Sequence, residues 1–356
     1  MNIKLKDLAD QVIVITGGSS GIGLVTARLA AKRGARLVLN ARNEVALQEI
    51  TSEINQAGGQ AIGVAGDVGK FEDVKRIADA AVERYGGFDT WVNNAGVSIY
   101  GQVLDQSLED QRRLFDTNYW GVVHGSMIAC GHLRTRGGGA LINVGSVLSD
   151  RAIPIQGTYC ASKHAVKGYT DALRMEIEEE GAPISVTLIK PSAIDTPYIH
   201  HAKNLLPVEP LNPPPVYAPE TVAEAILHCA ENAVRDVIVG GGGKALTAMS
   251  YYAPRVTDKA MEATMFDLQK TDKPRAAGKG NSLHAPSQDG AERGGYPGHV
   301  AESSIYTKAS LRPWLMGAVV AGAGLVFAAA RTKRQSTNTK SSGWHLGQSN
   351  NLKDVT

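Results

Sequence analysis

The sequence has few cysteines and little net charge, and each shortage excludes a class of protein. Its 356 residues include three cysteines, Cys130, Cys160 and Cys229, with no CxxC pair and no histidine at a metal-ligand interval. The formal net charge is +2, which gives no general attraction to nucleic acid. We therefore expect a reduced, cytosol-facing protein without a nucleic-acid partner.

An apolar leader and internal repeats are also missing. Residues 1–10 contain lysines but no hydrophobic run before the first expected strand, so a secretory signal is not supported. No repeat at solenoid spacing is visible. Hydrophobic residues make up 43% and charged residues 20%, as in ordinary globular proteins. This length and composition predict one large α/β unit with an appendage.

Short β-branched runs alternate with helical patterns from residue 11 to about residue 190, as in repeated βαβ units. The runs are apolar enough for burial on both faces of a parallel sheet. Seven strands are expected, at Val12–Thr16, Arg36–Asn40, Ala61–Ala65, Thr90–Val92, Ala140–Val144, Ser185–Ile189 and Val237–Val239. The predicted fold class is α/β, with a doubly wound parallel sheet and helices on both faces.

The composition changes after this unit. Between residues 195 and 217 a proline-rich stretch ending in Asn212–Pro215 predicts an ordered loop or lid, because it cannot continue a helix or a central strand. Beyond about Lys270 the chain is polar and lacks apolar periodicity until Leu311, which predicts a linker without a packed core. We divide the chain into a first domain (1–250), a C-terminal extension with a disordered linker (251–310), a candidate transmembrane helix (311–331) and a polar tail (332–356).

Residues 314–330 read WLMGAVVAGAGLVFAAA and are followed by Arg331, Lys333 and Arg334. As a helix this run reaches about 26 Å, slightly less than the roughly 30 Å hydrocarbon core. We expect a membrane anchor, and the alternative is a buried or interfacial helix. A third interpretation is a homo-oligomerisation helix, because Ala318 and Gly322 have the small-xxx-small spacing.

A glycine-rich turn, Thr16-Gly17-Gly18-Ser19-Ser20-Gly21-Ile22-Gly23, follows the first strand and begins an amphipathic helix. Glycine allows a tight turn and a close approach of the backbone to a pyrophosphate. The helix N-terminus adds amide donors and a positive dipole. The turn indicates dinucleotide binding, although by itself it also fits an ordinary tight strand-to-helix connection.

Further motifs follow in order. They are Asn93-Asn94-Ala95-Gly96 after the fourth strand, Asn118 within residues 117–121, Ser146 at the end of the fifth strand, and Tyr159-Cys160-Ala161-Ser162-Lys163. Together with the TGxxxGIG turn, these motifs resemble the short-chain dehydrogenase/reductase family over roughly residues 8 to 245. The resemblance implies a Rossmann-like fold, and it makes residues 1–250 an NAD(P)-binding catalytic domain. It also implies hydride transfer between a nicotinamide and a carbonyl or alcohol.

Tyr159 and Lys163 are four residues apart in a helical pattern, so both side chains project from one face. A free tyrosine has a pKa near 10, and an adjacent ammonium lowers it. We predict Tyr159 as the acid/base, with Lys163 lowering its pKa and Ser146 bonding the same substrate oxygen. By resemblance, Lys163 also contacts the nicotinamide ribose, and Asn118 holds a water of a proton relay. Taken one at a time, each of these residues would more often serve packing or be solvated. The argument for catalysis is that all four occur together with the glycine-rich turn.

Cofactor choice depends on Leu39-Asn40-Ala41-Arg42 at the end of the second strand. No acid stands there to bind a ribose 2′-hydroxyl, which favours NADP(H) over NAD(H), unless Arg42 is an ordinary exposed residue.

Asp67-Val68 resembles the family's adenine-binding pair, with a solvated loop aspartate as the alternative. Residues 191–196 resemble the PGxxxT segment beside the nicotinamide amide, with Ser192 in place of glycine. The predicted cofactor-binding residues are Gly17, Ser19, Ser20, Gly21, Ile22, Gly23, Arg42, Asp67, Val68, Asn94, Ala95, Gly96, Tyr159, Lys163, Pro191, Ser192 and Thr196.

The expected walls of a substrate site are apolar. They are Val147, Leu148 and Ile153 on one side and Tyr198, Leu205 and Leu206 on the other. We predict a hydrophobic ketone, aldehyde or secondary alcohol as substrate, although these residues could equally seal the loop to the domain. The rival hypothesis is a membrane-tethered NADPH-binding sensor or scaffold without turnover.

His200-His201 lacks carboxylate or thiol partners, so no metal is predicted. His124 and Cys130 lie on the helix after Asn118, which in the resembled family packs between subunits. We therefore expect a homo-oligomer, either a dimer or a tetramer, in which these two side chains belong to the interface or the core.

Overall fold

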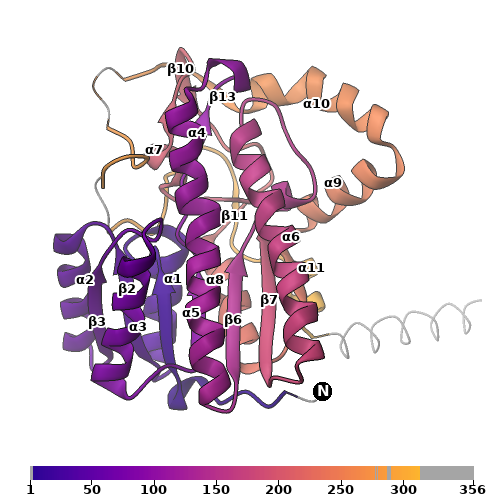
Figure 1. Cartoon of the computed structure of the whole chain (residues 1–356). Helices are drawn as coiled ribbons and strands as arrows, with labels where there is room; N and C mark the ends of the chain where they lie inside the picture. The colour runs from indigo at the N-terminus through magenta and orange to yellow at the C-terminus, as the bar shows by residue number, and fades with distance from the viewer. Residues whose placement is uncertain (1–2, 277, 279, 287–289, 313–356) are drawn as a thin grey trace, which may run out of the picture. The chain divides into compact units, whose positions relative to one another are not determined.

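The computed structural model describes residues 3–276, 278, 280–286 and 290–312. Met1–Thr307 form one compact unit, and a second unit starts at Lys308. The first unit holds a seven-stranded parallel sheet in the order β12-β7-β6-β4-β1-β2-β3 (Figure 1). The strands are β1 (Val12–Thr16), β2 (Arg36–Ala41), β3 (Gln60–Ala65), β4 (Thr90–Asn93), β6 (Gly139–Val144), β7 (Ile184–Pro191) and β12 (Asp236–Val239). All seven predicted strands and the doubly wound α/β fold are confirmed.

Strand β1 lies between β2 and β4. The chain therefore builds outward to β3, returns across β1 and continues to β12, and this reversal opens a crevice at the carboxyl ends of β1 and β4. Every residue of β1 and β7 is buried, because helices cover both sides of the sheet. Those helices are α1 (Gly21–Lys32), α2 (Glu44–Gln56), α3 (Phe71–Tyr85), α5 (Gly121–Thr135), α6 (Gly157–Glu179) and α8 (Pro219–Glu231).

The proline-rich stretch is ordered, as predicted. It contains α7 (Tyr198–His201), β9 (Lys203–Asn204), β10 (Val208–Pro210) and β11 (Val216–Tyr217), with a cis peptide bond between Pro214 and Pro215. Strand β9 pairs with β5 (Ile99–Tyr100), so the stretch is attached to the segment that follows β4. It therefore lies over the crevice side of the sheet.

The chain after β12 continues in α9 (Gly241–Tyr252) and α10 (Pro254–Leu268). Beyond about Lys270, where we expect a linker without a packed core, the described residues instead form β13 (Lys270–Pro274), β14 (Val300–Ala301) and α11 (Ile305–Leu311). Strand β13 pairs with β10, and β14 pairs with β11. Leu283 is fully buried. The lack of apolar periodicity did not reveal this order, because the buried residues of this region pack against the first domain rather than against one another.

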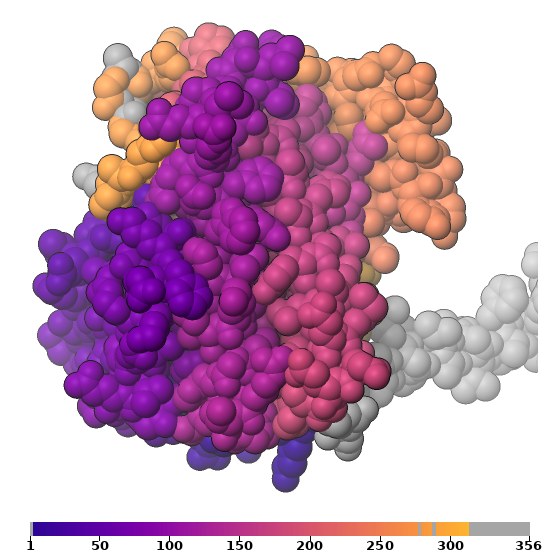
Figure 2. Space-filling model, in the orientation of Figure 1, coloured from indigo at the N-terminus to yellow at the C-terminus, as the bar shows by residue number. Residues whose placement is uncertain are grey.

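Helices α9 and α10 project from one corner of the unit, whereas atoms from the chain beyond Lys270 lie against the N-terminal part (Figure 2). The predicted transmembrane helix at 311–331 lies outside the described residues except for Leu311 and Arg312. None of the helices that the structure describes is long and apolar enough to cross a membrane. The anchor therefore stays a prediction, as does the helix-pairing role of Ala318 and Gly322.

Candidate active site

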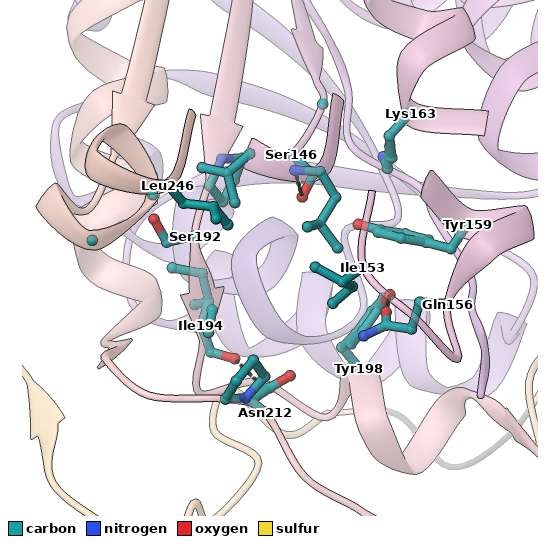
Figure 3. Close-up of a pocket in the computed structure, with 18 of the residues that line it drawn as sticks. Ser146, Ile153, Gln156, Tyr159, Lys163, Ser192, Ile194, Tyr198, Asn212 and Leu246 are labelled. Carbon is teal, nitrogen blue, oxygen red and sulfur yellow. Dashed lines mark hydrogen bonds between the residues drawn. The ribbon is translucent and has the colours of Figure 1, made fainter. Parts of the chain in front are cut away.

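Tyr159 and Lys163 lie one turn apart on α6, and both side chains are buried. Lys163 Nζ is 5.7 Å from the centroid of the Tyr159 ring and donates a hydrogen bond of 2.9 Å to the Val144 carbonyl oxygen. Because Val144 ends β6, this bond ties the helix to the carboxyl end of the sheet. Figure 3 shows both side chains at one cavity, together with Ser146.

Ser146 follows β6 and caps a short 3₁₀ turn at Val147–Ser149. Its Oγ accepts a hydrogen bond of 3.1 Å from the Leu148 amide, and its hydroxyl acts to lower the pKa of the Tyr159 phenol. Accepting this bond uses a lone pair of Oγ and not its proton. The Ser146 hydroxyl can therefore donate that proton toward Tyr159 or a substrate oxygen.

Asn118 lies in a π-helical turn, Asp116–Trp120, between α4 (Leu108–Phe115) and α5. Its Oδ1 accepts from Val97 N at 2.8 Å, and its Nδ2 donates to Val97 O and Ser162 Oγ. A Cβ added at Gly96 would lie 3.6 Å from Asn118 Oδ1 and 3.8 Å from Lys163 Nζ. The fold thus brings the four predicted catalytic residues to one place.

Burial has a different effect on Tyr159 from the one predicted. It raises the pKa of Tyr159 to about 12, although the hydrogen bond from Ser146 acts in the opposite direction. Burial also lowers the pKa of Lys163 to about 8, because the ammonium is removed from water. Burial therefore outweighs the groups that lower the pKa of Tyr159, and the predicted lowering of this pKa by Lys163 stays a prediction.

The glycine-rich turn borders a cavity of about 180 Å³ at the crevice. Gly17 has a φ of +66°, and a Cβ there would lie 2.8 Å from Ala95 Cα, so only glycine fits this position. A Cβ at Gly23 would collide with the Gly17 carbonyl oxygen. Predicted residues that line this cavity are Gly17, Ser19, Ser20, Gly21, Ile22, Arg42, Asp67, Val68, Asn94, Ala95, Gly96 and Thr196. Gly23 does not line it, and instead allows the helix to approach the turn.

Two charged residues of this cavity are bound by the chain itself. The Asp67 carboxylate pairs with Arg113 at 2.6 Å and accepts from Gly69 N. The Arg42 guanidinium donates to the carbonyl oxygens of Ser282 and, at 3.3 Å, Leu283. Both side chains therefore have fixed positions at the wall of the cavity.

Sequence reasoning missed a segment that we name the C-terminal strap, residues 280–286 and 290–296. Gly21 N donates to Ala291 O at 2.9 Å, and Gly290 N donates to Ser19 O at 2.8 Å, so the strap touches the glycine-rich turn. Leu283 packs in a cluster with Val97, Ile99, Leu114 and Tyr159. Ser282 and Pro286 line the cavity. The isolated Leu283 in a polar run was the only signal of this role.

A second cavity, of about 320 Å³, adjoins Tyr159. Val147, Leu148, Ile153 and Tyr198 line it as expected, whereas Leu205 and Leu206 lie in the packing beneath the loop. Pro191 and Ser192 line this cavity rather than the first. Further lining residues that sequence reasoning missed are Gln156, Ile194, Asn212, Pro213, Pro214, Pro215, Leu246, Met261 and Met265.

The histidines and cysteines of the described residues form no metal centre. His200 Nε2 contacts the Gly294 carbonyl oxygen, and His201 lines the first cavity. Within the described part of the chain, no group of histidine, cysteine and acidic residues could hold a metal ion. Cys130 is buried on α5, and His124 Nδ1 contacts the Val68 carbonyl oxygen at 3.0 Å.

Residues 11–204 match the short chain dehydrogenase family. An uncharacterized oxidoreductase of Bacillus subtilis, YxnA, is 49% identical over 93% of this chain and 94% of its own length. A Burkholderia phymatum short chain dehydrogenase/reductase in complex with NAD superposes with a TM-score of 0.63, at 25% identity over 72% of this chain and 96% of that chain. L-sorbose reductase from Gluconobacter frateurii, complexed with NADPH and L-sorbose, superposes with a TM-score of 0.58, at 25% identity over 68% of this chain and 98% of that chain.

The chain therefore belongs to the short-chain dehydrogenase/reductase family. It is an NAD(P)-dependent oxidoreductase that acts on CH–OH groups.

Proposed function

We propose that this protein interconverts a hydrophobic ketone or aldehyde and the corresponding alcohol, with Tyr159 as the acid/base and NADP(H) as the preferred cofactor. The observation that carries the proposal is the cavity that holds Tyr159, Ser146 and Lys163. Its other walls are mainly apolar, and it shares Ile22, Gly96 and Thr196 with the cavity at the glycine-rich turn. A bound nicotinamide supplies or accepts the hydride.

In the reducing direction, Tyr159 donates its proton to the carbonyl oxygen as negative charge develops there. A pKa of about 12 keeps the phenol protonated for this step. Ser146 donates a second hydrogen bond, since its Oγ already accepts from the Leu148 amide. The Lys163 ammonium beside the ring offsets the phenolate that Tyr159 becomes. In the oxidising direction, that phenolate takes the proton of the alcohol.

We assign the return of the proton to Lys163 and Asn118, with a water held by Asn118 between them. The support is that Asn118 Oδ1 and Lys163 Nζ both lie within 4 Å of the position of a Cβ added at Gly96, so the two polar atoms flank the same glycine. A water bound between them would have polar partners on two sides.

Arg42 is the basis for the preference for NADP(H). Its guanidinium lines the first cavity beside Ala41, where NAD enzymes place an acid, and carbonyl oxygens of the strap hold it there. Arginine binds phosphate groups with several fixed donors. The same reasoning assigns Asp67-Val68 to the adenine end, with Asp67 oriented by Arg113.

The rival sensor hypothesis has no structural feature in its favour. We propose that the enzyme works as a homo-oligomer through α5, which exposes Met127, and the turn before it, which exposes Trp120. Tethering by residues 311–331 is proposed from composition alone.

The test is turnover by the purified full-length chain with NADPH and a panel of apolar ketones. Tyr159→Phe is expected to abolish ketone-dependent NADPH oxidation while NADPH still binds, as measured by fluorescence titration. Tyr169→Phe removes a hydroxyl from the same helix at a position that lines neither described cavity, and serves as the matched control. Equal turnover in Tyr159→Phe and wild type would refute the mechanism, and no turnover by the wild type would favour the sensor.

A further inference from the structure

A buried hydrogen-bond chain starts at Gln269, directly after α10. Gln269 Nε2 donates to the carbonyl oxygens of Pro154 at 3.1 Å and Met265 at 2.9 Å. Backbone carbonyl oxygens can only accept, so this amide has one possible orientation, with its Oε1 on the opposite side. Gln269 is fully buried, which makes any unpaired alternative costly.

The orientation of Gln269 determines that of Gln156. Gln156 Nε2 donates to Gln269 Oε1 at 2.7 Å, because only a donor can face that oxygen. The Oε1 of Gln156 is left as an acceptor, and the Tyr198 hydroxyl donates to it at 3.2 Å. The single proton of Tyr198 is therefore committed to Gln156.

Tyr198 stands at the reacting end of the substrate cavity. Its ring packs edge-on against the Tyr159 ring with centroids 5.5 Å apart, and Figure 3 shows both side chains at the substrate cavity. Burial raises the pKa of Tyr198 well above its ordinary value, so the hydroxyl stays neutral. With its proton on Gln156, the Tyr198 oxygen can only accept a hydrogen bond from a molecule in the cavity.

We propose that Tyr198 is a specificity-determining residue that selects apolar ketones carrying a hydroxyl on the carbon next to the carbonyl carbon. The inference rests on the proposed function, in which Tyr159 turns its proton to the carbonyl oxygen. Because the Tyr198 hydroxyl donates its proton to Gln156, a substrate hydroxyl beside the reacting carbonyl can donate to the Tyr198 oxygen. Leu148, Ile153 and Leu246 line the cavity, so the remainder of the substrate is apolar. In the reverse direction the substrate is the corresponding 1,2-diol.

The test compares 2-hydroxyacetophenone with 2-methoxyacetophenone, using the full-length enzyme and NADPH. Both compounds carry an oxygen beside the carbonyl, but only the first can donate a hydrogen bond. The wild type is expected to prefer the hydroxy compound in kcat/KM by about tenfold or more, because the ether leaves a buried acceptor unpaired. Tyr198→Phe is expected to bring the ratio close to one. A merely structural role lowers both values and leaves the ratio unchanged.

Gln269→Leu is the second variant, since it releases the Gln156 amide and is expected to reduce the same ratio. If it does not fold, Tyr198→Phe decides by itself. Tyr100→Phe is the matched control, because the Tyr100 ring also packs edge-on against Tyr198 and its buried hydroxyl has no hydrogen-bond partner among the described residues. Reduction of both ketones with a ratio near one, or an unchanged ratio in Tyr198→Phe, overturns this inference and leaves the proposed function intact. Failure to reduce any ketone overturns both.

Discussion

The backbone amide of Gly21 donates a hydrogen bond of 2.9 Å to the carbonyl oxygen of Ala291. Gly21 begins α1 at the glycine-rich turn, and Ala291 belongs to the C-terminal strap. The strap therefore forms part of the wall around the dinucleotide cavity, and its anchoring residues are expected to affect cofactor affinity.

Leu283→Ala tests the strap. Leu283 is the fully buried strap residue in the Tyr159 cluster, and loss of its side chain removes the packing that seats Ser282 and Pro286 at the cavity. We expect the NADPH Kd to rise by about tenfold or more, since a buried Leu→Ala change costs about 2–5 kcal/mol. Fluorescence titration measures this Kd. Leu104→Ala, at a side chain that is 97% exposed, is the control. An unchanged Kd in Leu283→Ala would show that the strap does not support cofactor binding.

Arg42→Ala tests the cofactor preference. If Arg42 binds the 2′-phosphate as proposed, its loss is expected to weaken NADPH binding by about 1.5–3 kcal/mol and to leave NADH binding nearly unchanged. Parallel titrations with the two cofactors measure the difference. Arg235→Ala removes an exposed arginine that pairs with Asp171 and Asp236, and should change neither Kd. Equal losses for NADPH and NADH would argue that Arg42 only holds the strap.

The pH profile tests Lys163. Its pKa is lowered to about 8, so the ammonium is present below that pH and is lost as the pH rises through it. Tyr159 stays protonated in the same range because its pKa is raised to about 12. We expect kcat/KM for ketone reduction to fall above about pH 8, since this parameter reports the free enzyme.

Lys163→Arg should remove the fall near pH 8 from the residual activity, because a guanidinium keeps its charge. A wild-type profile that is flat from pH 7 to about pH 10 would contradict the assignment of Lys163.

Gly23→Ala tests the close approach of α1 to the turn. The added Cβ meets the Gly17 carbonyl oxygen, so we expect a loss of about 1–3 kcal/mol in the free energy of unfolding, together with weaker NADPH binding. Gly131→Ala is the matched control on α5, where a Cβ meets nothing within 4 Å. That change should stabilise the protein by about 1 kcal/mol. Chemical denaturation of both variants gives the comparison, and a neutral Gly23→Ala would be inconsistent with this packing.

Local patterns predicted the sheet well because each strand is a continuous apolar run whose burial needs only its own helices. The predicted and observed bounds of β1 agree, and the other strands differ by a residue or two at their ends. The predicted catalytic residues also came together, since Ser146 follows β6, Tyr159 and Lys163 lie on the helix after it, and Asn118 is hydrogen-bonded to Val97 beyond β4. The pKa values of these residues could not be predicted from local patterns. Burial of Tyr159 decides its pKa, and burial depends on Leu283 and Tyr198, which are distant in sequence.

The sequence by itself determined the fold class and the glycine-rich turn, because these depend on short-range spacing along the chain, and its resemblance to a family predicted the group of Asn118, Ser146, Tyr159 and Lys163. Only the tertiary structure decided what surrounds them. The walls from α9 and α10, the strap at Gly21 and the orientation of the Tyr198 hydroxyl all come from contacts between distant segments. Such contacts leave no periodicity in the chain, because a single buried side chain such as Leu283 or Gln269 needs no repeating pattern around it.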